Sequence, residues 1–136
     1  LGDQELIRRV RETAVKMAET VEEAIQSNGS IIYEKDLASG HVNANRSWWA
    51  QSETIVGYLN AFELSGDEKF LDYAINCWRY TYDHHVDRVN GGWFPNVRET
   101  DETPWGDKAG HWICPYHNGR MAMEVAERVE RMINKK

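Results

Sequence analysis

Hydrophobic residues recur every three or four positions along four stretches of this chain, with charged and polar residues between them. This spacing places the hydrophobic side chains on one face of a helix and is typical of helices that cover a core on one side. The four stretches are residues 3–26, 48–64, 67–86 and 118–134. The pattern therefore predicts an all-α chain of about four helices.

Residues that start and stop helices separate the second stretch from the third. Ser47 is a favourable N-cap, and Gly66 and Asp67 form a tight break in which glycine ends one helix and aspartate caps the next. So short a connection makes two neighbouring helices run in opposite directions. We therefore predict an antiparallel hairpin of residues 47–65 and 67–86.

The connections between the helix pairs are longer and mostly polar. Residues 31–34 have the composition of a short strand, and residues 35–45 are predicted as a loop. Residues 93–97 predict a second short strand at a sheet edge, because Pro95 argues against a central position. Residues 98–108 form another polar loop. Helix pairs separated by such loops favour an all-α toroid or helical array over a parallel sheet.

Residues 110–120 contain the densest group of potentially functional side chains in the chain: two aromatic residues, two histidines, a cysteine and an arginine. Pro115 suits the first turn of a helix, so His117 is predicted near a helix N-terminus. The exposed N–H groups and the dipole at that end disfavour positive charge, which favours the neutral, proton-accepting form of an imidazole. His117 is therefore a candidate general base.

Two other interpretations of the same segment stay open. His111 and His117 can simply cap a helix or fill a polar pocket, which is the commoner role of histidines. Alternatively, His111, Cys114 and His117 are separated by two residues each and form a candidate metal set. Zinc would require a fourth ligand, and Pro115 stiffens the middle of the segment.

Composition narrows the class of protein. A length of 136 residues and a hydrophobic fraction of 41% are ordinary for one globular domain or a piece of one. The net charge of -6 and the lack of a Lys/Arg cluster argue against a nucleic-acid surface. No apolar run has the length of a membrane span, and none has the pattern of a signal peptide. Two cysteines do not form a disulfide framework, so we expect a cytoplasmic protein.

Six tryptophans and six tyrosines are the unusual feature of the composition. Flat aromatic faces in this number suit stacking on sugar rings, although most aromatic residues of a domain belong to its core. The chain also begins at Leu1 without a methionine, on the approach to its first helix. We therefore expect a fragment of a longer protein.

Four motifs resemble, in this order, the C-terminal part of the N-acylglucosamine 2-epimerase superfamily. They are Trp-Trp-Ala-Gln-Ser-Glu at residues 48–53, Ser-Gly-Asp-Glu-Lys-Phe-Leu at 65–71, Gly-Gly-Trp-Phe at 91–94 and Trp-Ile-Cys-Pro-Tyr-His-Asn-Gly-Arg at 112–120. The Cys-Pro-Tyr-His-Asn-Gly-Arg form of the last motif is most similar to the cellobiose 2-epimerase branch. The resemblance covers nearly the whole chain.

The resemblance implies an (α/α)6 barrel, in which six inner helices surround a pocket and six outer helices cover them. Residues 1–136 would form a single partial domain, the C-terminal third of that barrel, with the N-terminal part of the same barrel as its partner. By the alternation of the family, the second and fourth predicted helices are inner and the first and third are outer. The active site lies where the inner helices begin, so Trp49, Glu53 and His117 are expected to face one cavity.

The resemblance also implies reversible epimerisation at C2 of a reducing sugar, of the cellobiose or the N-acylglucosamine type. A base removes the C2 proton, a cis-enediolate forms, and an acid returns a proton to the other face, without cofactor or metal. Two histidines share these tasks, and His117 matches one of them. Trp49 and Trp112 match residues that stack on or shape the sugar pocket. Glu53 would orient a histidine or a hydroxyl, and Arg120 would contact the substrate.

Other activities remain open at this point. A mannose isomerase of the same superfamily passes through the same enediolate on the way to a ketose. A glycoside hydrolase on an (α/α)6 barrel would need two carboxylates across a cleft, with Glu53, Asp83 and Asp87 as candidates. A non-catalytic helical module would show a repeated unit, and the sequence has none at a fixed period.

A third of a closed barrel has consequences for the isolated chain. Its inner helices would expose hydrophobic flanks that the missing helices normally cover, so we expect the chain alone to self-associate or to be only marginally stable. The second histidine of the family's chemistry, and the arginine that helps to hold the enediolate oxygen, would lie outside this chain. We therefore expect the chain alone to be inactive.

Overall fold

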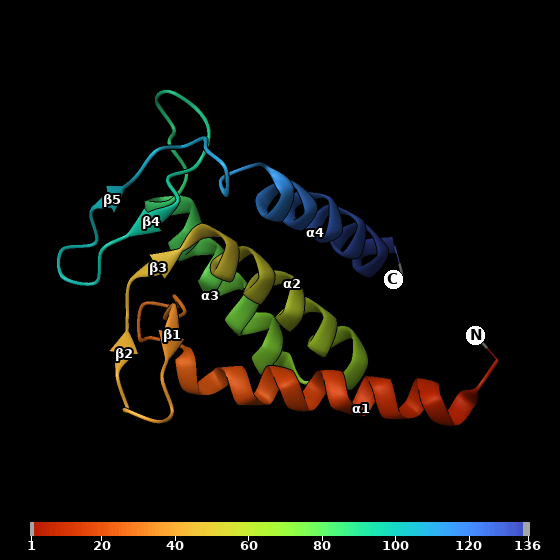
Figure 1. Ribbon diagram of the computed structural model, residues 1–136. Coiled ribbons are helices and arrows are strands. Elements are labelled where there is room, and N and C mark those ends of the chain that lie inside the picture. The colour runs from red at the N-terminus through yellow and green to blue at the C-terminus, as the bar shows by residue number, and fades with distance from the viewer. Residues whose placement is uncertain (1, 135–136) are drawn as a thin grey trace.

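A computed structural model describes residues 2–134, within which lie four α-helices and five very short strands (Figure 1). The helices are α1 (Gln4–Val21), α2 (Trp48–Ser65), α3 (Glu68–His84) and α4 (Tyr116–Asn134). The all-α class and the number of helices predicted from the hydrophobic spacing are confirmed. None of the helices in this part of the chain combines the length and apolar character that crossing a membrane requires.

The strands form two small antiparallel sheets. β1 (Glu34–Lys35) pairs with β2 (Val42–Asn43), and β3 (Arg46–Ser47), β4 (Asn96–Val97) and β5 (Pro104–Trp105) form a three-stranded sheet in that order. The second sheet joins segments that are far apart in the sequence, since Ser47 lies opposite Asn96. In Figure 1 both sheets lie at the end of the molecule where α2 begins.

α2 is the central helix and contacts the other three. In Figure 1, α1 and α4 lie on opposite sides of α2, and α3 packs along it. α2 and α4 both begin at the end that carries the sheets, whereas α1 and α3 run the other way. This alternation matches the inner and outer helices that the family resemblance implies.

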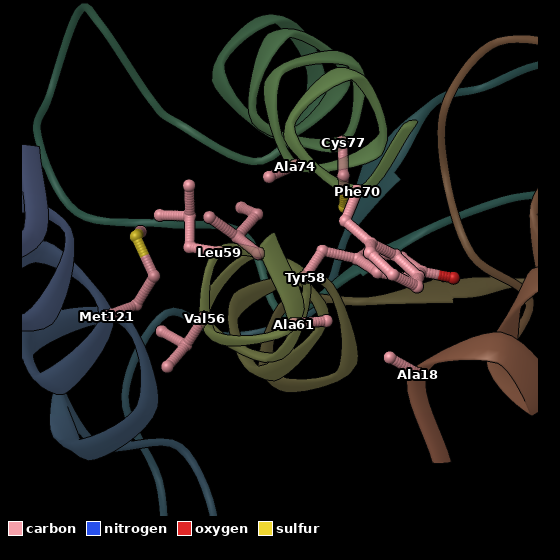
Figure 2. Close-up of a cluster of buried hydrophobic side chains, with 10 residues drawn as sticks. Ala18, Val56, Tyr58, Leu59, Ala61, Phe70, Ala74, Cys77 and Met121 are labelled. Carbon is pink, nitrogen blue, oxygen red and sulfur yellow. The ribbon is translucent and has the colours of Figure 1, made fainter. Parts of the chain in front are cut away.

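The core explains why α2 is central. Nine of its eighteen residues are buried, so both of its sides are covered, whereas one residue of α1 and one of α4 are buried. Figure 2 shows the Leu59 side chain between α2 and α4, close to Met121, and Ala18 of α1 approaching α2 from the other side. On α3, Phe70 stacks on Tyr58 of α2 with ring centroids 5.9 Å apart.

The turn between α2 and α3 forms as predicted. Gly66 has a φ of +73°, which a residue with a side chain rarely adopts, and its N–H donates to the Phe62 carbonyl at 2.8 Å. Asp67 then caps α3 by accepting from the Lys69 N–H at 3.0 Å. The predicted helical hairpin is confirmed.

Several predicted boundaries were wrong. α1 ends at Val21 rather than near residue 26, and a 3-10 turn, η1 (Glu22–Ala24), follows it. The helix stops early because Ile25 is extended and forms a β-bridge with Ile31 across the turn at residues 27–29, a pairing that overrides helical spacing. The first strand accordingly lies at Glu34–Lys35 rather than at residues 31–34. α4 begins at Tyr116, two residues before the predicted start.

The position of the second predicted strand was also wrong, because β4 is the central strand of its sheet and not an edge. Pro95 lies just before β4, so its missing N–H removes no hydrogen bond from the ladder. Its carbonyl accepts from the Trp48 N–H at 2.9 Å, at the first residue of α2. Ser47 occupies the N-cap position, but its side chain makes no capping hydrogen bond.

Two apolar grooves flank the helices. A groove of about 840 Å³ runs between α3 and α4 over α2, and one of about 470 Å³ lies between α1 and α2. Hydrophobic side chains also stand exposed on α1 and α4, among them Leu6, Val10, Met17, Met123 and Ile133. The exposed residues of α4 and the grooves beside α2 are open flanks of inner helices, as expected, whereas the exposed residues of the outer helix α1 were not predicted.

The turn at Gly29 lies closely against α3, and this approach can be tested. A Cβ at this position, where φ is +86°, would lie 2.8 Å from the backbone carbonyl of Asn76. Gly40 has a φ of +72° and open space around it. We expect Gly40→Ala to cost about 1–2 kcal/mol of unfolding free energy from backbone strain, and Gly29→Ala to cost roughly 1–3 kcal/mol more. Urea unfolding of the two variants measures the difference, and equal losses would contradict the close approach.

Candidate active site

His117 and Glu53 form the centre of the site. His117 is the second residue of α4, and its Nδ1 lies 2.8 Å from Oε1 of Glu53, which stands in the second turn of α2. Both side chains remain about one third exposed, at 31% and 35%. Because an ionised carboxylate only accepts hydrogen bonds, Nδ1 carries the hydrogen in this pair. The lone pair of the neutral ring is therefore on Nε2.

Arg120 binds the other oxygen of the same carboxylate. Its guanidinium donates to Oε2 of Glu53, and its second amino group lies 3.9 Å from Glu124, one turn further along α4. Glu53 is thus held by two residues of α4 that are three positions apart and share one helix face. The positive charge of Arg120 compensates the negative charge of the carboxylate. The ion pair also fixes α4 against α2 at the site.

Aromatic rings surround the His117 imidazole. The Trp49 ring is tilted by 44° to it with centroids 5.9 Å apart, and the Trp48 ring approaches edge-on at 6.2 Å. Tyr116 lies edge-on at 5.0 Å, and Tyr33 stands edge-on to Trp49 at 6.1 Å. Such rings offer flat apolar faces to a ligand.

The position of these side chains follows from how α2 is anchored. Trp49 and Glu53 are four residues apart and therefore lie on one face of the helix. Gln51 is fully buried and points the other way, where its amide both donates to and accepts from the backbone of Ile31 at 2.9 Å. With Trp48 bound to the Pro95 carbonyl, the first turn of α2 is held from two sides.

Trp112 is the one predicted site residue that the structure does not bring into this group of contacts. Its side chain is 90% exposed, in a tight turn closed by two hydrogen bonds between the backbones of Gly110 and Ile113. Trp49, Glu53, His117 and Arg120 do come together, across 64 to 67 residues of sequence between the partners.

A family model described as N-acylglucosamine 2-epimerase (GlcNAc 2-epimerase) matches residues 3–118. This chain belongs to that family. It is 43% identical over 126 residues to a cellobiose 2-epimerase of Bacteroides fragilis, covering 92% of this chain and 32% of the relative. A cellobiose 2-epimerase of Dictyoglomus turgidum is 38% identical over 130 residues, covering 95% of this chain and 33% of the relative.

Solved structures of the N-acylglucosamine 2-epimerase family agree in fold. The crystal structure of a sugar epimerase from a ruminal bacterium superposes with a TM-score of 0.85 at 37% identity, over 93% of this chain and 33% of the other. Cellobiose 2-epimerase from Bacillus thermoamylovorans superposes with a TM-score of 0.78 at 34% sequence identity, over 93% of this chain and 31% of the other. These relatives are (α/α)6 barrels, and the present chain spans about a third of their length. The family and the partial barrel expected from the motifs are confirmed.

Sequence reasoning missed several members of the site. Trp48 was not predicted as a site residue, yet its ring lies edge-on to His117. Tyr33 was not predicted as a site residue, because residues 31–34 were predicted only as a short strand and contain no motif of catalytic or binding residues. Glu53 and Arg120 were each predicted, but their pairing was not. A pairing across two helices leaves no periodic trace in the sequence.

The geometry gives no support to the metal set proposed for the 110–120 segment. Within residues 2–134, no three His, Cys, Asp or Glu side chains gather closely enough to hold a metal ion. His111 and Cys114 are both exposed, whereas His117 turns toward Glu53.

A second histidine, His85, is fully buried at the end of α3. Its Nδ1 lies 2.8 Å from the Phe94 carbonyl, and the Phe94 N–H donates to the carbonyl of His85 at 2.7 Å. Burial lowers the pKa of His85 from 6.5 to about 4, against the opposing effect of the Phe94 carbonyl. His85 therefore acts as a neutral structural residue between α3 and the strand region.

This burial predicts a pH dependence of stability. Between the pKa values of about 6.5 unfolded and about 4 folded, the unfolded chain binds a proton that the folded chain does not, so stability falls as the pH drops through this window. We expect a loss of about 2 kcal/mol from His85 between pH 7.5 and pH 5. Urea unfolding at both pH values should show a smaller loss for His85→Gln than for the parent chain. The control His41→Gln, at an exposed position, should behave like the parent.

Proposed function

We propose that the protein containing this chain epimerises C2 of a reducing sugar of the cellobiose type, and that His117 is one of its two acid/base residues. The observation that carries this proposal is the hydrogen bond between Nδ1 of His117 and Glu53, which fixes one ring nitrogen as donor and leaves Nε2 as acceptor. The names of the relatives supply the reaction class.

The proposed reaction begins with the open-chain aldose. A base takes the proton from C2, and the C–H electron pair forms the C1–C2 double bond of an enediolate while negative charge moves to the aldehyde oxygen. An acid then returns a proton to C2 from the opposite face, which inverts the configuration. Nε2 of His117 is suited to either step, and the partner residue would come from the rest of the barrel.

The surroundings of His117 fit a sugar. Trp49 and Tyr33 present ring surfaces beside the imidazole, and sugar rings have apolar C–H faces that pack on aromatic rings. Trp112 is exposed and available to a ligand. Of the three carboxylates considered for a glycoside hydrolase, only Glu53 lies beside His117. Asp87 binds Lys108, and Asp83 is exposed.

The decisive experiment uses the full-length protein with cellobiose in D2O. Proton abstraction at C2 predicts that glucosyl-mannose appears with deuterium at C2, followed by NMR. Deuterium at C1 of a ketose product would instead identify an aldose-ketose isomerase. Release of free glucose from cellobiose would identify a hydrolase, and no change in the sugar would refute the proposed substrate class.

The isolated chain is proposed to self-associate and to be inactive. The groove of about 840 Å³ between α3 and α4 is lined almost entirely by apolar side chains, including Leu71, Trp78 and Val125. Apolar surface of this extent on a chain of 136 residues favours association. We expect sedimentation velocity to show concentration-dependent species larger than 15.8 kDa. A monodisperse monomer over a hundredfold range of concentration would contradict this expectation.

A further inference from the structure

Asp87 organises the turn that follows α3. One carboxylate oxygen accepts from the N–H groups of Val89 and Asn90, both at 3.0 Å, and the other accepts from the Asn90 side chain at 3.3 Å. The backbone of Asp87 pairs with Gly91 and Gly92 in the same turn. The side chain is 8% exposed, so this carboxylate has little contact with water.

Lys108 reaches this turn from a different part of the chain. Its Nζ donates to Oδ2 of Asp87 at 2.7 Å and to the Gly91 carbonyl at 2.8 Å, and it lies 5.4 Å from the centre of the Phe94 ring. An ion pair between fully exposed groups is worth little, but here one partner is largely buried and the lysine makes two hydrogen bonds. Lys108 and the turn amides hold the pKa of Asp87 well below its usual range.

The segment that follows Lys108 has few other constraints. Of residues 109–115, only Ile113 is partly buried, and none belongs to a helix or strand. The segment ends at Tyr116, where α4 begins and where Glu53 holds His117. Without the contacts of Lys108, the nearest anchored residue upstream is Gly106, whose backbone packs closely on Pro95. The unanchored length would grow from residues 109–115 to residues 107–115.

We infer that Asp87 and Lys108 are positioning residues: they fix the upstream end of residues 109–115, which include Trp112, against the turn after α3, and so limit where Trp112 can lie relative to the start of α4. In its catalytic part this inference rests on the proposed function. His117 is held separately, by its hydrogen bond to Glu53. The contact between Asp87 and Lys108 should therefore affect how the sugar is bound more than it affects proton transfer.

The first test measures the mobility of the segment directly, independently of activity. Cys114 is exposed, whereas Cys77 is 1% exposed and burial raises its pKa to about 12, so a thiol-reactive spin label will attach at Cys114. The label is placed in the full-length protein after replacement of any cysteine outside this chain. We expect a more mobile electron paramagnetic resonance spectrum in both Lys108→Met and Asp87→Asn.

Two control variants make this measurement specific. Lys108→Arg keeps the charge and can still reach the carboxylate, so it should restore most of the immobile component. Lys35→Met makes the same substitution at an exposed lysine of β1 and should leave the spectrum unchanged. An unchanged spectrum in both Lys108→Met and Asp87→Asn would overturn the inference.

The second test separates positioning from a merely structural role. In the unlabelled full-length protein, Lys108→Met and Asp87→Asn should each raise KM for the sugar by about 10-fold and change kcat much less, because a misplaced binding surface mainly weakens substrate positioning. The double variant should lose no more than either single one, because both remove the same contact. If the label on Cys114 became more mobile but KM stayed unchanged, Asp87 and Lys108 would anchor the segment without positioning the substrate, and that part of the inference would be overturned. If the parent protein does not act on the sugar, the proposed function fails, and the label spectra still decide the anchoring.

Discussion

Replacing His117 with Asn in the full-length protein is expected to lower turnover of the sugar by at least about 100-fold, because positioned acid/base groups contribute about 100-fold to 10,000-fold each. Asparagine is smaller than histidine and can still donate to Glu53, so the contact between α2 and α4 should survive. The amide cannot take or return the C2 proton. NMR of cellobiose epimerisation gives the turnover, and a thermal melt checks the fold.

The matched control for this substitution is His111→Asn, six residues earlier in the same segment and exposed to solvent. It should leave turnover close to that of the parent. If His117→Asn instead kept near-normal turnover with a lower melting temperature, His117 would be a capping residue. Sensitivity of the parent enzyme to chelators would favour the metal alternative. Either result would end the assignment of proton transfer to His117.

Replacing Glu53 with Gln is expected to cost about 100-fold in turnover for a different reason. A carboxylate accepts a hydrogen bond from Nδ1 of His117, whereas the amide of glutamine can donate one to it. The imidazole can then carry its hydrogen on Nε2, which removes the lone pair from the nitrogen proposed to face the sugar. Arg120 also loses its negative partner, which weakens the ion pair that joins α4 to α2.

Glu63→Gln is the matched control for this variant. Glu63 lies further along α2 and also binds arginines of α4, Arg128 and Arg131. Losing those ion pairs should lower stability slightly without changing turnover, since they are remote from His117. A pH profile of kcat/KM distinguishes the two effects, because only Glu53→Gln should change its shape. Equal turnover losses in both variants would mean that Glu53 acts only through helix packing.

The sequence was sufficient to predict the helices because their signals are local. The spacing of hydrophobic residues located α2 and α3, and the Gly66–Asp67 break located the turn between them. Boundaries and strand positions were less accurate where backbone pairing outside the helices decides them. α1 stops because Ile25 pairs with Ile31, and β4 is central because Pro95 falls just outside the ladder. The sequence around Val21 does not indicate that Ile25 pairs with Ile31, and the sequence around Pro95 does not indicate that β4 has a neighbour on each side.

The site was predictable in part through the motifs and in part through helix geometry. Trp49 and Glu53 lie on one face because they are four residues apart, and the position of His117 near a helix start followed from Pro115. The shared carboxylate between His117 and Arg120 depends on how α4 packs on α2. That packing is set by the whole core, so the sequence alone does not reveal it.

The hydrogen bond from the Trp48 amide to the Pro95 carbonyl has a consequence for folding, because the site is complete only once this bond has formed. The α2–α3 hairpin needs only near neighbours in the chain, whereas this bond must close a long loop, which is slower. The first turn of α2, which carries Trp49, is therefore completed only after the β4 strand docks beside β3. In a pulsed hydrogen-exchange experiment on refolding protein, the Trp48 amide should be among the last of its helix to become protected.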